Sequence, residues 1–220
     1  MSRLLGGSAS PIGWSVQYIH ASPDSVLDAV RKVHTEVELR VSPPRPYPEV
    51  LENLVPFEAP WARELVMRCG NWTAYLNNFV NGGDLTGIGP AIARDLDVRC
   101  VVAEHSPRHG PGHEGTQLWV MGPQGEPPLI YERTLSAVAA DGRWKWYESG
   151  CPLPFEDLSR YTARRIRDRL DRALLTRYLQ ELGIPAEDDD AYGHGVVVQQ
   201  LVRWPRRTVS LADANRELNR

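Results

Sequence analysis

Residues 69–104 decide the fold of this chain, and their sequence is CGNWTAYLNNFVNGGDLTGIGPAIARDLDVRCVVAE. The part from Trp72 to Phe79 has the aromatic and β-branched content of a strand. The glycine pair at 82–83 predicts a turn, and large apolar residues recur at near-helical spacing over residues 84–96. Because the apolar run Val98–Glu104 then predicts another strand, this stretch indicates the centre of an α+β domain.

Further strand-like runs extend the predicted sheet on both sides of this centre. They are Ile12–His20, Glu64–Cys69, Thr116–Met121, Leu129–Ala139, Arg143–Glu148 and Val196–Trp204. The pair Asp141-Gly142 between two of these runs is a strong hairpin signal. In the strand that follows, Trp144 and Trp146 fall on one face and Lys145 and Tyr147 on the other. We therefore predict a mixed or antiparallel sheet with a C-terminal three-strand meander.

About three helices are predicted to pack on this sheet. The first covers residues 23–37, where Ser22 can cap the helix and Pro23 takes its first position. The second covers residues 84–96, and the third covers residues 157–182 and ends at Gly183. The predicted fold class is α+β.

The length of 220 residues and the 42% hydrophobic content suit one domain with a substantial core. We predict a single α+β domain over residues 1–204 and a polar C-terminal tail over residues 205–220. Prolines crowd residues 42–60, which cannot form a central strand or a long helix. This Pro-rich arm is expected to cross the domain, and a linker is the alternative.

Composition and charge narrow the function classes. The net charge of −3 argues against a general nucleic-acid surface, and no apolar run approaches the length of a membrane span. The N-terminus lacks the apolar region of a signal peptide. The three cysteines follow no disulfide or zinc pattern. We expect a cytoplasmic protein with no membrane association and no cofactor.

Three histidines, His105, His109 and His113, form the one histidine cluster of the sequence. Imidazoles and the neighbouring carboxylates could bind a transition metal. Spacing by four places them on one side only in a helix, and the prolines and glycines between them forbid that helix. The sequence therefore favours an exposed polar loop over a metal site.

A second candidate site lies around the central strand. Trp72, Tyr75, Asn77, Asn78 and Asp84 could line a pocket that fixes a polar ligand or a partner. Asparagine and aspartate also favour turns, which explains residues near the glycine pair without any function. Asn77 and Asn78 are harder to explain, because asparagine is disfavoured within a strand.

Arginines crowd the third predicted helix, over residues 160–177. A basic helix can follow the phosphates of a nucleic acid. These arginines surround much of the helix, however, as on a solvated face. For these arginines the sequence most favours a solvated helix face. Binding of an acidic partner is the second interpretation, and binding of nucleic acid is the third.

Two segments, Gly70–Asn78 and Gly150–Glu156, carry a resemblance to known sequences. With the glycine turn and the arginine-rich segment, they resemble a group of uncharacterised, mainly actinobacterial proteins over residues 60–182. The resemblance implies a bacterial protein and carries over no site residue. By analogy alone, small acidic α+β proteins of this kind resemble the immunity proteins of toxin systems.

The leading hypothesis is a non-enzymatic intracellular binding protein, in the form of an immunity-type or antitoxin-like partner of a bacterial toxin. Its seven tryptophans can anchor a protein interface, and no catalytic motif stands out. The alternative is a small-molecule-binding protein or enzyme with a pocket around Trp72, Tyr75, Asn77 and Asn78.

Overall fold

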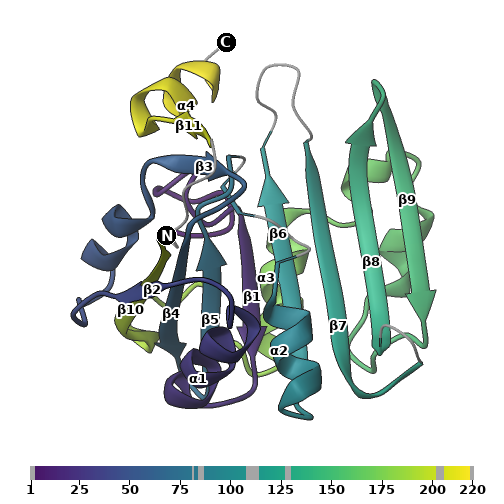
Figure 1. Ribbon diagram of the computed structural model, residues 1–220. Helices are drawn as coiled ribbons and strands as arrows, with labels where there is room; N and C mark the ends of the chain where they lie inside the picture. The colour runs from purple at the N-terminus through teal and green to yellow at the C-terminus, as the bar shows by residue number, and fades with distance from the viewer. Residues whose placement is uncertain are drawn as a thin grey trace.

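The computed structural model describes residues 3–80, 82–83, 87–107, 114–126, 130–201 and 206–218. Within these ranges the chain forms a nine-stranded antiparallel sheet with helices on both faces, and a separate two-stranded sheet (Figure 1). The α+β class, the antiparallel sheet, the C-terminal meander and the three main helices are confirmed. None of the described helices combines the length and the apolar character that crossing a membrane requires.

The strands of the large sheet follow the order β2-β10-β4-β5-β1-β6-β7-β8-β9. Their bounds are β1 Ser15–Ile19, β2 Leu39–Val41, β4 Arg63–Cys69, β5 Trp72–Asn77, β6 Cys100–Ser106, β7 Gly115–Glu126, β8 Tyr131–Ala140, β9 Arg143–Gly150 and β10 Tyr192–Gln200. The small sheet pairs β3 Phe57–Ala59 with β11 Arg207–Val209. The helices are α1 Pro23–Val33, α2 Gly89–Asp95, α3 Arg172–Glu181 and α4 Leu211–Leu218, with 3₁₀ turns η1 Glu49–Leu54, η2 Leu158–Thr162, η3 Ile166–Asp168 and η4 Asp189–Ala191.

The predicted centre of the fold contains the expected strands β5 and β6 and the helix α2 between them. In the sheet, however, β5 and β6 are not adjacent. Strand β1 lies between β5 and β6, with Gln17 opposite both Tyr75 and Val102. Helix α1 begins as predicted, because the Ser22 side chain accepts a hydrogen bond from the main chain of Ser25. The helix ends at Val33 and not at residue 37 as predicted. The next residue, His34, lies against the buried carboxylate of Glu64 in the sheet.

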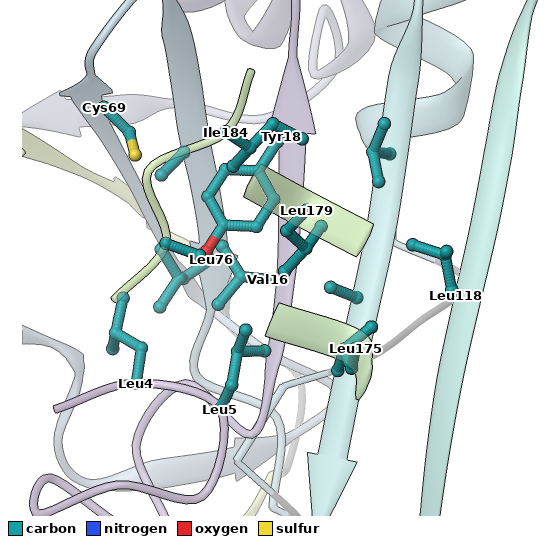
Figure 2. Packing of buried hydrophobic residues seen from close by; sticks show 14 of the residues in the cluster. Leu4, Leu5, Val16, Tyr18, Cys69, Leu76, Leu118, Leu175, Leu179 and Ile184 are labelled. Carbon is teal, nitrogen blue, oxygen red and sulfur yellow. The ribbon is translucent and has the colours of Figure 1, made fainter. Parts of the chain in front are cut away.

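The two faces of the sheet hold separate apolar clusters, because side chains alternate along each strand. On the front face in Figure 1, helices α1 and α2 cover residues such as Ile19, Tyr75 and Val102. On the back face, α3 and the N-terminal segment (residues 3–14, before β1) pack on the strand residues that point to that side. Figure 2 shows Leu175 and Leu179 of α3 among these back-face side chains.

The C-terminal meander is confirmed in detail. Asp141 and Gly142 join β8 to β9 with φ angles of +54° and +72°, which is the conformation of a tight hairpin turn. Trp146 points to the back face, where its ring centroid lies 5.1 Å from that of Tyr161.

The predicted continuous helix over residues 157–182 is wrong in its first half. Only α3 is an α-helix there, and η2 and η3 precede it. Arg160 donates hydrogen bonds to the carbonyl oxygen of Asp168 (2.7 Å), and Arg169 donates to that of Ala163 (3.0 Å). Arg160 and Arg169 therefore hold the main chain in turns. The arginines at 164, 165 and 167 are exposed to solvent as expected, but they do not form one helix face.

The Pro-rich arm is packed against the sheet. Its turn η1 buries Val50, Leu51 and Leu54, and β3 lies at its end. Within the predicted polar tail, β11 pairs with β3 and α4 follows it. The division of the chain into one domain and a tail stays a prediction.

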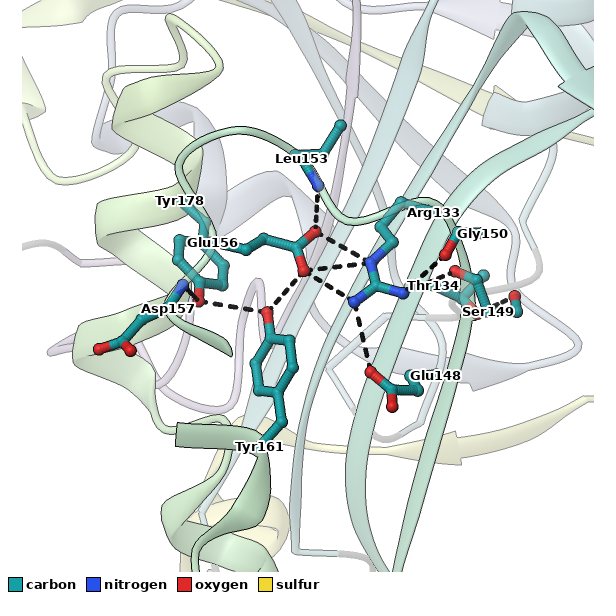
Figure 3. A network of polar contacts seen from close by, with 10 residues as sticks. All are labelled: Arg133, Thr134, Glu148, Ser149, Gly150, Leu153, Glu156, Asp157, Tyr161 and Tyr178. Atoms are coloured by element: carbon teal, nitrogen blue, oxygen red, sulfur yellow. Dashed lines mark hydrogen bonds and ion pairs between the residues drawn. The ribbon is translucent and has the colours of Figure 1, made fainter. Parts of the chain in front are cut away.

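A buried ion pair anchors the segment that follows the meander. Arg133 of β8 is 2% exposed and Glu156 is fully buried, with 2.7 Å between Arg133 Nη2 and Glu156 Oε2 (Figure 3). Arg133 also donates to the main-chain oxygens of Ser149 and Gly150, and the Tyr161 hydroxyl donates to Glu156. Burial alone would lower the pKa of Arg133, but the hydrogen bonds and charge of Glu156 raise it above its ordinary value.

We predict that Arg133→Met lowers the free energy of unfolding by about 3–5 kcal/mol, because Glu156 is left as an unpaired buried charge. Urea unfolding measures the loss. The matched control is Arg143→Met, at the exposed start of β9, for which we expect a change below about 0.5 kcal/mol. Equal effects of the two substitutions would contradict a structural role for the pair.

Candidate functional site

The predicted site residue Trp72 lines a hollow at one end of the large sheet. The hollow has a volume of about 510 Å³. The His20 ring lies against Trp72, with 4.7 Å between ring centroids. Another part of the lining is an ion pair, in which Arg99 Nη2 lies 2.7 Å from Glu132 Oε2.

This Trp72 hollow is assembled from segments that are far apart in the sequence. The remaining lining residues are Asn71, Asp97, Val98, Pro123, Gln124, Leu182 and Gly183. An aromatic ring, an exposed imidazole and charged groups in a space of this size suit a small polar molecule, since ligand pockets measure about 300–1,000 Å³.

Tyr75 lies on the other face of the sheet from Trp72, and it contacts the buried carboxylate of Glu64. Its hydroxyl donates to Glu64 Oε1 at 2.6 Å, and Trp61 Nε1 donates to the same oxygen at 3.3 Å. His34 Nε2 lies 2.9 Å from Glu64 Oε2, and the Glu64 side chain is fully buried. These contacts join the end of α1 to β4 and β5, which gives Tyr75 a structural role.

Asn77 and Asn78 are buried at the end of β5. Asn78 Oδ1 accepts hydrogen bonds from the main chain of Ala62 and Arg63, and its Nδ2 donates to the carbonyl oxygen of Pro56 and to Glu58. Asn77 Oδ1 accepts from the Phe79 main chain at 3.2 Å. Asn78 thus satisfies its amide by joining the start of β4 to the end of the Pro-rich arm, at Pro56 and at Glu58 of β3, which explains an asparagine at this position.

Three residues of the sequence-based predictions, Asp84, His109 and His113, lie outside the described residues. The remaining histidine of the cluster, His105, lies on β6, and its Nδ1 is 3.0 Å from Thr116 Oγ1. In the described part of the chain no group of three or more histidine, cysteine or acidic side chains is placed to hold a metal ion.

The pKa of His105 predicts a pH dependence of stability. Burial, with a smaller contribution from the Arg172 charge, lowers the pKa of His105 to about 4. Between that value and the ordinary value near 6.5, the unfolded chain binds a proton that the folded chain does not. Stability is therefore lost as the pH falls from about 6.5 towards 4.

We predict that His105→Gln removes this part of the pH dependence. Between about pH 7.5 and pH 5, wild-type protein should lose ~1–2 kcal/mol more unfolding free energy than the variant, after a discount for the partial exposure of His105. Urea unfolding measures the change in unfolding free energy between the two pH values for each protein. Subtracting the two changes cancels the contributions of the other titrating groups. Identical pH dependence would show that His105 is protonated alike in the folded and unfolded chains.

The front face of the meander is the third feature with functional potential. No described helix lies in front of β8 and β9, whereas α1 and α2 cover the strands beside them (Figure 1). We call this surface the open face, and it carries Gln117, Trp119, Thr134, Ser136, Lys145, Tyr147 and Ser149. Tyr147 is 54% exposed, the most exposed of the large hydrophobic side chains in the described part of the chain.

Hydrogen bonds between side chains hold the open face in shape. Trp119 Nε1 donates to Ser136 Oγ at 3.2 Å, and the Ser136 hydroxyl donates to Gln117 Oε1 at 2.9 Å. Gln117 Nε2 in turn donates to Glu104 Oε2 at 2.7 Å. Thr134 and Ser149 are joined by their hydroxyls at 2.6 Å. The surface is therefore ordered before any partner binds.

Comparison with known proteins adds no assignment: no family model, no curated protein and no solved structure matches this chain. The resemblance to uncharacterised actinobacterial proteins stays a prediction. Sequence reasoning placed Lys145 and Tyr147 on one face of β9, but it missed that Trp119 lies on the same face of the sheet, two strands away on β7. Alternation within β7 is the signal that could have found it.

Proposed function

We propose that this protein is a binding protein whose partner, another protein, docks on the open face of strands β7 to β9. The observation that carries the proposal is a sheet face that no described helix covers, with the exposed Tyr147 on its outer strand β9. Tyrosine and tryptophan are enriched at the anchoring positions of protein interfaces. The hydroxyls of Thr134 and Ser149, which are joined to each other, can accept hydrogen bonds from a partner without a large cost in conformational entropy, whereas Ser136 is buried.

The outer edge of the same surface supports a protein partner over a small molecule. Strand β9 ends the sheet and pairs only with β8 among the described strands. A strand from a partner could therefore extend the sheet through main-chain hydrogen bonds. Strand β9 has eight residues, which is long for a strand at the edge of a sheet. The strand at the opposite edge, β2, has three.

The specific form of this proposal is an immunity-type or antitoxin-like protein that covers a bacterial toxin in the cytoplasm. The cysteines support a reducing compartment, because Cys69, Cys100 and Cys151 are free thiols. Burial raises the pKa of Cys69 to about 12, so this thiol is held in its unreactive form.

The test uses the product of a toxin-like reading frame next to the gene. We expect a complex with the wild-type chain, and at least tenfold weaker binding by Tyr147→Ala in calorimetry, with rescue from toxicity lost in parallel. The matched control is Leu158→Ala, which removes a side chain that is 51% exposed on η2, away from the open face. No complex with the wild type, or equal affinity of both variants, would overturn the proposal.

A second candidate function is the binding of a small polar molecule in the Trp72 hollow. The contact between the His20 and Trp72 rings favours it, because a planar ligand can stack beside an exposed imidazole. Of the four residues expected to line a pocket, this proposal retains Trp72 as a binding residue. Tyr75, Asn77 and Asn78 have structural roles instead.

A thermal-shift screen of small polar metabolites tests this second function. A ligand of the hollow should raise the melting temperature of the wild type and of His194→Ala, an exposed histidine of β10 outside the hollow. It should raise the melting temperature of His20→Ala much less. Equal shifts in both variants would place the ligand elsewhere, and no shift with any metabolite would count against the function.

A further inference from the structure

Three arginines line a separate hollow near the β2 edge of the sheet. The hollow has a volume of about 460 Å³ and lies between strands β2, β10 and β4 and the Pro-rich arm. Arg40 comes from β2, Arg45 from the arm and Arg63 from β4. Together with Gln199 of β10 they define what we call the arginine hollow.

The pairing of the strands fixes the arginines in a row. Gln199 lies opposite Arg40 on one side and opposite Arg63 on the other, so the three side chains start from the same face of the sheet. With about 4.8 Å between neighbouring strands, the Cα atoms of the two arginines are ~10 Å apart. Arg45 lines the same hollow from the arm, which is fixed to β10 by main-chain hydrogen bonds of 3.0 and 2.9 Å between Arg45 and Gly195.

The positive charge of this row is largely unneutralised. Arg63 donates to the carbonyl oxygen of Pro56, and Arg45 donates to the Asn53 side chain, and both acceptors are neutral. Arg45 also lies 3.8 Å from Glu52, whose side chain is 75% exposed. Arg40 forms no ion pair or side-chain hydrogen bond with the described residues.

Repulsion between these like charges disfavours the folded chain only weakly, because Arg40 is exposed and solvent screens the charges. A chain with a net charge of −3 has acidic side chains elsewhere, yet three guanidinium groups here meet one exposed carboxylate. The unneutralised charge is explained if an anion occupies the hollow, since guanidinium groups bind phosphate and carboxylate oxygens through two parallel hydrogen bonds.

We propose that the arginine hollow binds a small organic anion that carries two oxyanion groups. Arg40 and Arg63 each hold one group, Arg45 reinforces the positive charge from the arm, and the Gln199 amide lies between the two groups. The volume of about 460 Å³ accommodates a molecule of metabolite size. Phosphate and carboxylate share this chemistry, and the probes below distinguish them.

The experiment is calorimetric titration of the full chain with pyrophosphate and with citrate, and with acetate as the singly charged comparison. We expect one of the two multivalent probes to bind with a dissociation constant below about 1 mM, and its binding to weaken as NaCl is added. Tighter binding of pyrophosphate assigns a phosphate ligand, and tighter binding of citrate assigns a carboxylate ligand.

Two variants locate the binding in the hollow. Arg40→Gln should weaken it at least tenfold while the melting temperature without ligand stays equal or rises, because Arg40 gives up no partner. The matched control is Arg143→Gln, an exposed arginine on β9, which should bind as the wild type does. Arg63→Lys retains the charge and loses the paired donors, so it should also weaken binding, and it serves if Arg40→Gln fails to fold.

Three results would overturn the proposal. One is the absence of saturable binding of both multivalent probes to the wild type. Another is equal weakening by Arg40→Gln and Arg143→Gln, which would show diffuse attraction to surface charge. The third is acetate binding as tightly as citrate and pyrophosphate, which would exclude two oxyanion groups as the recognised feature.

Discussion

A nine-stranded antiparallel sheet has two faces to cover, and this requirement determines most of what the rest of the chain does. Helices α1 and α2 cover the front of the central strands, while α3, η1 and the N-terminal segment fill the back. Strands β8 and β9 extend beyond the reach of the front helices. The open face is thus a direct consequence of the number of strands and of where the helices stand.

Two fully buried carboxylates join segments that are distant in the sequence. Glu64 joins His34 at the end of α1 to Tyr75 and Trp61, and Glu156 joins Arg133 of β8 to the turns after the meander. Removing a partner from such a site leaves an uncompensated buried charge, which is far more costly than losing a surface ion pair. Because the partners of these carboxylates come from the structure itself, we place ligands and partners on other surfaces.

The open face and the arginine hollow lie near opposite edges of the large sheet, and the Trp72 hollow lies at its end. The three regions share no lining residue, although Glu132 of the Trp72 hollow lies two residues from Thr134 of the open face along β8. The open face is aromatic and rich in hydroxyl groups, the Trp72 hollow contains charges of both signs, and the arginine hollow is strongly basic. The binding experiments therefore separate a protein partner, a neutral or zwitterionic molecule and an anion.

The sequence by itself determined the local elements, because alternation, turn residues and helix caps act over a few residues. Asp141-Gly142 was sufficient for the β8–β9 hairpin, and Ser22-Pro23 for the start of α1. Only the tertiary structure decided that β1 lies between β5 and β6, that Arg160 and Arg169 bind main-chain carbonyls, and that Asn78 joins β4 to the end of the Pro-rich arm. It also brought Arg40, Arg45 and Arg63 to one hollow and left Tyr147 uncovered. These outcomes depend on which distant segments meet, and pairing across long sequence separations leaves no periodic signal in the chain.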